Sequence, residues 1–311
     1  MRDLPDLTLL CLKVIAKTPT EFINEKALDR PYRAYPKSLL NSSTQMMIDY
    51  ISEAGRLTDA VFPLNSFDTG RTYLSFKNSK ISAKYLIAVL KRCPLLTHLD
   101  VSGCFPIDDD VIAVILDSCP LLENLCIRNC RKLTDETLVS IQKESKCINI
   151  LSIGGNINIT ETGLQRFINT YSLAHSLLEL HVSGLPLTPG VLAAVGRCSS
   201  LRSLSLGYAL LTSETFRAVM EQVGGGLEAL SLAWAEAVAQ RDIGGAGSSS
   251  LSSGDHDSLL DHVRLNCPQL VSLDLIGMKN VNTAALSQVI DFKYSQVSTL
   301  AGTTSICNAC F

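Results

Sequence analysis

The sequence predicts an α/β fold in which short parallel strands alternate with helices and stack into a solenoid. A leucine pattern, L-x-x-L-x-L, recurs at nearly constant spacing along most of the chain. Within each copy apolar and polar residues alternate, as in a strand with one buried face. A polar capping residue and apolar residues at helical spacing follow. A period of roughly 20 to 30 residues with this pattern is the signature of the leucine-rich repeat.

The repeat is clearest in two consecutive copies, each of which starts with Cys-Pro-Leu-Leu. Their strand leucines, Leu99 and Leu125, are 26 residues apart. Because one residue in two faces each side of a strand, Leu99 should be buried. Either Asp108 or Asp109 is placed to cap the following helix. We expect the inner face of that helix to be formed by three apolar residues: Val111, Val114 and Ile115.

The same register predicts about eight repeats and therefore a right-handed α/β leucine-rich-repeat solenoid over residues 71–291. The strand leucines are Leu74, Leu99, Leu125, Leu151, Leu180, Leu204, Leu230 and Leu273. The last step is 43 residues long and contains a Gly/Ser-rich stretch, which predicts a flexible insertion over residues 237–257. We expect residues 1–70 to form a helical N-terminal cap and residues 292–311 a C-terminal cap or tail.

Composition narrows the function and the compartment. The chain has 311 residues, a net charge of −3 and no basic stripe, which argues against general nucleic-acid binding. It has no apolar run of about 18 residues and no signal-peptide pattern. With 11 cysteines and no secretory signal, we expect free thiols and a cytoplasmic or nuclear location. The repeat accounts for seven of them: Cys93, Cys104, Cys119, Cys130, Cys147, Cys198 and Cys267.

The sequence shows no pattern of residues that predicts catalysis, a metal site or a cofactor. Two pairs with suitable chemistry, His98 with Asp100 and Glu179 with His181, are predicted to lie three repeats apart. At about 4.8 Å per strand, about 14 Å would separate them, too far to share one metal ion. The triple glycine at 224–226 is not followed by the Lys-Ser/Thr of a phosphate-binding loop, and the Cys-x-x-Cys at 307–310 has no second half. We therefore expect a protein that is not an enzyme.

The cysteine-bearing repeats resemble those of F-box/LRR proteins, the Amn-type mitotic-exit antagonist, and the Zyg/Zer substrate receptors of cullin-RING ubiquitin ligases. The resemblance covers roughly residues 71–291, and the repeats alone serve all three families. Trp234 is the only tryptophan, and no F-box core was found upstream. The choice between families therefore depends on residues 1–70.

Residues 4–16 are predicted to form an amphipathic helix, for which two interpretations stay open. It either caps the first repeat, or it resembles the box helix that inserts into Elongin C. The second interpretation rests on Leu7, Cys11 and Ile15, which are spaced four apart as helix-in-groove anchors are. Asp6 departs from the box, which prefers a small or hydroxyl residue before its leucine. The proline and leucines at Pro36 and 39–40 resemble the segment by which Zyg/Zer receptors touch the cullin.

The resemblance implies a non-catalytic substrate receptor of a cullin-RING E3 ubiquitin ligase, with Elongin B/C, a cullin and a client protein as partners. The armadillo-type region that reads the client in Zyg/Zer receptors has no counterpart in this sequence, so client recognition is not carried over. The alternative is an Amn-like interaction scaffold or inhibitor without a ligase.

The strand residues that alternate with the buried leucines should form a concave binding face, since solenoids bind partners there. Early repeats place long polar side chains on it, and later repeats place Ser, Gly and Ala. A solvated face without a partner is the competing interpretation. The candidate contact residues are Tyr73, Lys77, His98, Asp100, Asn124, Arg128, Ser152, Glu179, His181, Ser205, Ser231 and Asp274.

Overall fold

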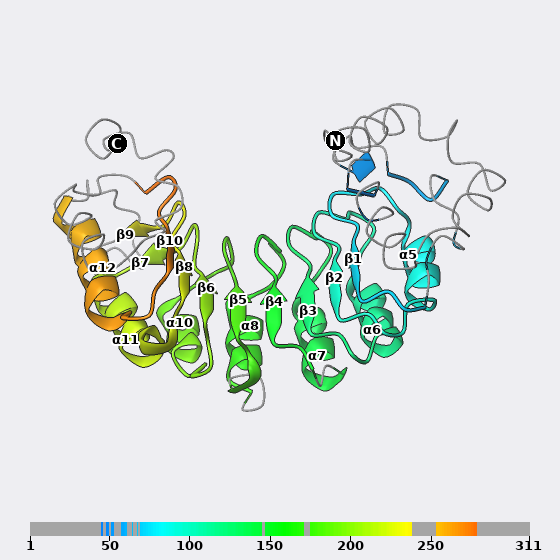
Figure 1. The fold of residues 1–311 in the computed structure, drawn as a ribbon. Helices are drawn as coiled ribbons and strands as arrows, with labels where there is room; N and C mark the ends of the chain where they lie inside the picture. The colour runs from blue at the N-terminus through cyan, green and yellow to red at the C-terminus, as the bar shows by residue number, and fades with distance from the viewer. Residues whose placement is uncertain are drawn as a thin grey trace, which may run out of the picture. The chain divides into compact units, whose positions relative to one another are not determined.

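The computed structural model describes residues 45, 48, 49, 51, 52, 57–60, 64, 67, 69–144, 147–170, 175–237 and 253–278 (Figure 1). The chain divides into two compact units, Met1–Ile148 and Asn149–Phe311, which we describe separately as unit 1 and unit 2.

The architecture is an open sheet of eight parallel strands that alternate with helices, in the order β1-β2-β3-β4-β5-β6-β8-β10. Unit 1 contains β1 (Tyr73–Ser75), α5 (Ala83–Leu90), β2 (His98–Asp100), α6 (Asp109–Ser118), β3 (Asn124–Cys126) and α7 (Asp135–Glu144). This element order confirms the predicted α/β leucine-rich-repeat solenoid.

Unit 2 continues the alternation and adds a short second sheet, in which β7 pairs with β9. Its first half comprises β4 (Ile150–Ser152), α8 (Glu161–Ile168), β5 (Glu179–His181), α10 (Pro189–Val195), β6 (Ser203–Ser205) and β7 (Leu210–Leu211). Its second half comprises α11 (Ser213–Val223), the 3-10 turn η3 (Gly224–Gly226), β8 (Ala229–Ser231), β9 (Glu236–Ala237), α12 (Ser253–Asn266) and β10 (Ser272–Asp274).

The register of the sheet is set by the leucine at the centre of each three-residue strand. In unit 1, Leu74 pairs with Leu99 and Leu99 with Leu125. In unit 2, Leu180 lies between Leu151 and Leu204. Every strand leucine is 2% exposed or less. A slip of one residue would turn all of them to the other face of the sheet, so their burial specifies the pairing.

Side chains at the helix N-termini also tie neighbouring repeats together. Asp108 is the N-cap of α6 and accepts a hydrogen bond from the Val111 amide at 3.1 Å. Asp109 instead reaches the next repeat, where it accepts hydrogen bonds from the amide and hydroxyl of Thr134 and from the hydroxyl of Thr137. In unit 2, Glu161 accepts one from the Thr188 hydroxyl. The sequence left open which aspartate caps α6. The structure assigns the cap to Asp108 and the link to the next repeat to Asp109.

The inner face of α6 differs from the prediction at one position. Val111 and Ile115 are buried as expected, but Val114 is only half-buried. Ile112 and Leu116 complete the buried face. The helix packs against both neighbouring helices, α5 and α7, so its buried stripe is wider than the one that we predicted.

Four cysteines of unit 1, Cys93, Cys104, Cys119 and Cys130, are small buried groups, and some of them also link repeats. The Cys104 thiol donates to the Phe76 carbonyl at 3.1 Å, and the Cys130 thiol donates to the Val101 carbonyl at 3.3 Å. Burial raises the pKa of Cys119 and of Cys130 to about 12, so both thiols stay protonated at neutral pH. Cys147 differs from the others in being exposed.

The residues described before β1 cover the open edge of the sheet. The side-chain amide of Gln45 donates a hydrogen bond to the Ser75 carbonyl at 3.0 Å, and its oxygen accepts one from the Ser75 backbone amide at 3.2 Å. Ile48 and Ile51 are completely buried beside it. A single side chain thus pairs the backbone groups that a further strand would pair, which protects an edge open to aggregation.

Several predicted segments fall partly or wholly outside the described residues. They include the predicted helix over residues 4–16 and the tail over residues 292–311. The expected insertion covers residues 237–257, but residue 237 is the last residue of β9, and α12 already begins at Ser253. The helix therefore begins earlier than we predicted. Among the described helices, none is long and apolar enough to cross a membrane.

Candidate protein-binding face

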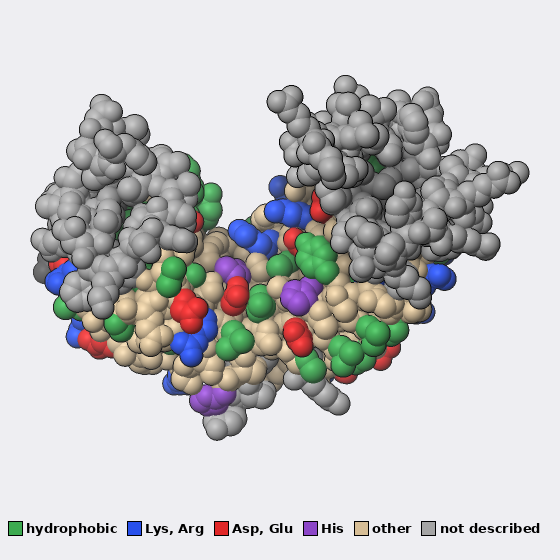
Figure 2. Space-filling model, viewed as in Figure 1, with side chains coloured by type: hydrophobic (Ala, Val, Ile, Leu, Met, Phe, Trp, Pro, Cys, Tyr) green, Lys and Arg blue, Asp and Glu red, His purple; other side chains and the backbone are tan. Residues whose placement is uncertain are grey.

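In each unit the described helices that follow the strands lie on one side of them and leave the other side uncovered by these helices (Figure 1). We call this uncovered side the open face; it presents the first and third residue of every strand. Side chains there are mostly intermediate in exposure, while the central leucines are buried. The predicted alternation therefore places the candidate residues on one surface in each unit. Figure 2 shows acidic, histidine and hydrophobic side chains interspersed over the molecule.

The open face of unit 1 carries large polar and aromatic side chains. The rings of Tyr73 and His98 lie side by side, with centroids 6.4 Å apart. The Thr97 hydroxyl and Nδ1 of His98 are 2.7 Å apart, which orients the imidazole. Burial, and then the charges of Asp49 and Asp100, raise the pKa of Tyr73. This surface combines an exposed phenol with nearby negative charge.

Further along the same unit, hydrogen bonds within the face hold its polar groups in place. Asp100 accepts from the Ser102 amide at 2.9 Å, and the Ser102 hydroxyl accepts from the Arg128 amide at 3.2 Å. The Cys126 thiol faces the Asn124 side chain at 3.5 Å. The side chain of Arg128 is exposed. Lys77 is exposed as well, and its carbonyl accepts from the Ser52 hydroxyl.

The open face of unit 2 is lined with small side chains that hydrogen-bond to one another. The hydroxyls of Ser183 and Ser205 are 2.7 Å apart. The Ser231 hydroxyl donates to Asp274 at 2.9 Å. His181 and Glu179 approach to 3.5 Å, which forms an ion pair when the histidine is protonated. The result is a shallow floor with negative charge at β5 and β10.

One candidate contact residue is poorly placed for binding. Ser152 is only 3% exposed, although its strand position assigns it to the open face, and it therefore offers almost no surface to a partner. The other open-face candidates are half-buried or exposed. The four N-terminal candidates, Leu7, Cys11, Ile15 and Pro36, lie outside the described residues.

Two functional candidates were missed in the sequence, Tyr208 and Trp234. Both are exposed and both lie three residues beyond a strand, outside the alternating strand positions on which our prediction relied. The signal was available, however. The equivalent residue after the first five strands is Asn or Gly, as at Asn78 and Gly103, so two aromatic residues at this position break the repeat.

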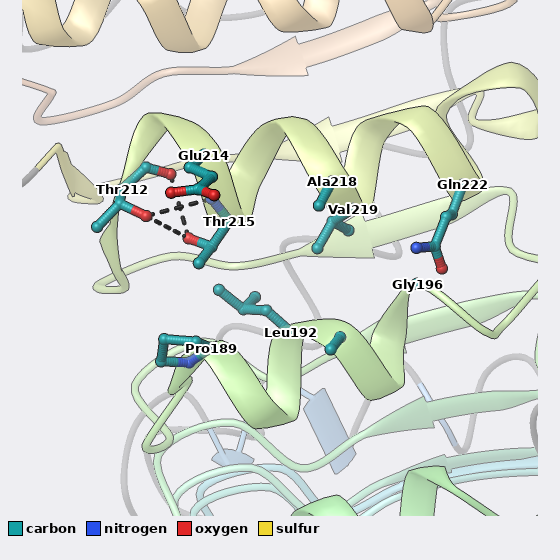
Figure 3. Close-up of a pocket in the computed structure, with 10 residues that line it drawn as sticks. Pro189, Leu192, Gly196, Thr212, Glu214, Thr215, Ala218, Val219 and Gln222 are labelled. Atoms are coloured by element: carbon teal, nitrogen blue, oxygen red, sulfur yellow. Dashed lines mark hydrogen bonds between the residues drawn. The ribbon is translucent and has the colours of Figure 1, made fainter. Parts of the chain in front are cut away.

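A cavity of about 470 Å³ lies on the helix side of unit 2, between α10 and α11 (Figure 3). The facing positions carry small residues, which leaves room for the cavity: Ala193 on α10, Gly196 at the C-cap of α10, and Ala218 on α11. Leu192 and Val219 point into it, and Thr212 and Thr215 hydrogen-bond at one end. This lining favours apolar contact and provides no cluster of catalytic groups.

The metal-binding interpretation of the two histidine–acid pairs finds no support within either unit. His98 and Asp100 belong to unit 1, and Glu179 and His181 to unit 2. In the part of the chain that the structure describes, no group of three or more His, Cys, Asp and Glu side chains is placed to hold a metal ion.

Comparison with known proteins gives similarity of fold at low identity. The chain is similar to a protein in the crystal structure of the Rad7 and Elc1 complex in yeast, with a TM-score of 0.48 and 15% identity over 93% of this chain and 84% of that chain. It is similar to the leucine-rich repeat-containing protein LegL7 from Legionella pneumophila, with a TM-score of 0.47 and 18% identity over 69% of each chain. It is also similar to an internalin, InlF, from Listeria monocytogenes, with a TM-score of 0.41 and 18% identity over 65% of this chain and 55% of that chain. No model of a protein family matches the sequence, and no curated protein matches it.

Proposed function

We propose that the chain is a non-catalytic substrate receptor of a cullin-RING E3 ubiquitin ligase, acting in the cytoplasm or nucleus. The proposal rests on one combination: leucine-rich repeats with an open sheet face, preceded by Leu7, Cys11 and Ile15 at the spacing of an Elongin C box. The repeats would hold a client protein. The N-terminal residues would dock Elongin C, and the segment around Pro36 would contact the cullin.

In this proposal the chain supplies binding and position, while other subunits supply the chemistry. A helix that inserts its apolar face into a groove gains affinity from a few anchors on that face, here four residues apart. Holding a client beside the ubiquitin-conjugating enzyme raises the effective concentration of its lysines, which increases the rate of transfer without any group from the receptor.

The second candidate function is an interaction scaffold or inhibitor that associates with no ligase. One observation favours it: residues directly before the repeats serve the fold itself. Gln45 pairs the backbone of Ser75 at the edge of β1, and Ile48 and Ile51 are fully buried. If residues 4–16 extend this cap, their apolar face is occupied within the chain.

Co-purification with Elongin B/C distinguishes the two candidates. We expect the wild-type chain to capture Elongin B/C, and Leu7→Ser/Cys11→Phe to lose capture while its melting temperature is unchanged. Leu9→Ser/Leu12→Phe is the matched control, because a helix places positions 9 and 12 opposite to positions 7 and 11.

Two outcomes would contradict the receptor proposal. The first is a wild-type chain that captures no Elongin B/C. The second is capture that the control variant loses as fully as the test variant. A fall in melting temperature in the test variant alone would support the cap interpretation and hence the scaffold.

A further inference from the structure

The turn after each strand of the eight-stranded sheet uses one backbone conformation. The third residue beyond each of the eight strands has a positive φ, between 56° and 74°. Six of these residues are Gly or Asn, which adopt the left-handed region readily. The remaining two are Tyr208, with φ 61°, and Trp234, with φ 58°. Large aromatic residues are disfavoured there, so the fold retains them against a backbone cost.

Packing of the aromatic rings follows the repeat. The rings of Tyr208 and Trp234 are stacked, with centroids 6.2 Å apart and planes 4° apart. The indole then covers Gly277 at the next turn, where an added Cβ would lie 2.3 Å from its ring. Adjacent turns are joined by hydrogen bonds, from the Tyr208 amide to the Ala233 carbonyl and from the Trp234 amide to the Ile276 carbonyl. The two rings are thus held rigidly.

The stacked rings nevertheless remain largely accessible to solvent. Tyr208 is 64% exposed and Trp234 is 48% exposed. Two residues further on, Leu210 is 58% exposed and pairs with Glu236, which is also exposed. We call Tyr208, Trp234, Leu210 and Glu236 the aromatic ledge. A strained, rigid and exposed aromatic pair has the properties of a binding hot spot, because little entropy is lost when a partner covers it.

The surface next to the aromatic ledge is formed by small side chains and carries negative charge. Gly207 and Ala233, which directly precede the two rings, continue the serine floor of unit 2. Asp274, which accepts a hydrogen bond from Ser231, carries a negative charge on this floor, and Glu179 carries one further away on β5, where it approaches His181. Among the described residues, the open-face positions of β5, β6, β8 and β10 include no lysine or arginine.

We propose that the aromatic ledge anchors an extended, arginine-containing segment of a partner protein. A guanidinium stacks on an indole or phenol face, and arginine does so more often than lysine. The acidic floor complements its charge, and the small side chains let a peptide backbone approach closely. A nucleic-acid strand would also stack on the rings, but it needs a basic groove, whereas this floor is acidic. The inference rests on the protein-binding part of the proposed function and names the chemistry of the client.

Intrinsic fluorescence tests the proposal directly, because Trp234 is the only tryptophan in the chain. The probe is a synthetic peptide, GSGRGRGSG, titrated into the full-length protein. We expect a saturable change in tryptophan emission. The same peptide with citrulline in place of both arginines keeps the size but loses the charge, and it should bind about tenfold more weakly or not at all.

Substitutions that restore the repeat's own residue separate binding from folding. Tyr208→Asn and Trp234→Asn introduce the residue found at Asn78 and Asn129. We expect either variant to keep or raise the melting temperature, because asparagine tolerates the left-handed conformation. We expect each to bind a fluorescein-labelled peptide at least about tenfold more weakly by polarisation. Phe105→Ala removes an exposed ring from unit 1 and should bind as wild type.

Four outcomes would overturn the proposal. They are no saturable signal in the wild type, equal binding of the citrulline peptide, unchanged binding in both asparagine variants, and a ten-nucleotide thymidine strand that binds more tightly than the peptide. Elongin B/C capture should be the same in wild type and Tyr208→Asn. If the arginine peptide does not bind but Elongin B/C is captured, only the aromatic-ledge proposal is contradicted. If the peptide binds but Elongin B/C is not captured, only the ligase proposal is contradicted.

Discussion

The open faces of the two units present different chemistry on the same backbone. In unit 1, Tyr73 and His98 form a half-exposed aromatic and polar surface, and Gln45 covers the edge of the sheet. In unit 2, β6 and β8 present only serine and alanine on this face, and aromatic side chains occur instead at the turns that follow, as Tyr208 and Trp234. The difference teaches that two strand positions and one turn position can change the surface chemistry of a repeat while the buried strand leucines stay the same.

The largest effect tests whether the two units share one kind of core. Leu125→Ala in unit 1 and Leu204→Ala in unit 2 should each lower the free energy of unfolding by about 2–5 kcal/mol, because both side chains are completely buried. Urea unfolding measures both losses. Leu121→Ala, at a position that is 46% exposed, is the control and should change it by about 0.5 kcal/mol or less. A small loss at either buried leucine would contradict the equivalence of the two cores.

The next largest effect compares how much the inter-repeat hydrogen bonds of each unit contribute to stability. Asp109→Ala should lower the free energy of unfolding by about 1–3 kcal/mol, because it leaves the completely buried Thr137 hydroxyl without its acceptor. Glu161→Ala should cost about 0.5 kcal/mol or less, because its bond to Thr188 is exposed. Asp110→Ala, one residue away and exposed, serves as the control. Equal losses at Asp109 and Glu161 would contradict this distinction.

A smaller effect is expected at the covered edge of unit 1. Gln45→Ala should cost about 1 kcal/mol, because the amide and carbonyl of Ser75 lose their partners. Hydrogen exchange at the Ser75 amide should accelerate, whereas exchange at the Leu99 amide in the interior of the sheet should not. Unchanged exchange at Ser75 would show that another group protects this edge.

The pH dependence of stability should carry the signature of Asp109. Burial alone would raise the pKa of its carboxyl, but hydrogen bonds from Thr134 and Thr137 outweigh burial and hold the pKa below its usual range. The stabilisation is therefore complete above the unfolded value near pH 4 and is lost as pH falls through the folded value. Asp109→Ala should flatten the acid limb of stability in urea unfolding at a series of pH values. An acid limb as steep as that of wild type would contradict the assignment.

Much of this fold follows from periodicity alone. The eight strand leucines were placed correctly because each repeat must bury the same position against its neighbours. The inner face of α6 was predicted less well, since Val114 fits a helical period but Ile112 and Leu116 meet more of the core. The spacing of apolar residues does not by itself predict how wide the buried stripe of a helix is.

The sites were harder to predict than the fold, for physical reasons. That Gln45 would stand in for a strand depends on where a segment outside the repeats meets the edge of the sheet, and no local pattern encodes this. Tyr208 and Trp234 escaped because hydrophobic periodicity finds residues that are buried, whereas these are exposed and held by backbone geometry. Aligning the turn positions of the repeats, where asparagine and glycine prevail, would have found them.

Hydrogen exchange on the full chain, with and without the arginine peptide, tests most directly the claim that the two faces differ in function. We predict slower exchange within residues 203–210 and 229–236 of unit 2, and unchanged exchange at β1, β2 and β3 of unit 1. The Trp234→Asn variant should show neither change. Protection of the unit 1 strands, or equal protection of both units, would contradict the account.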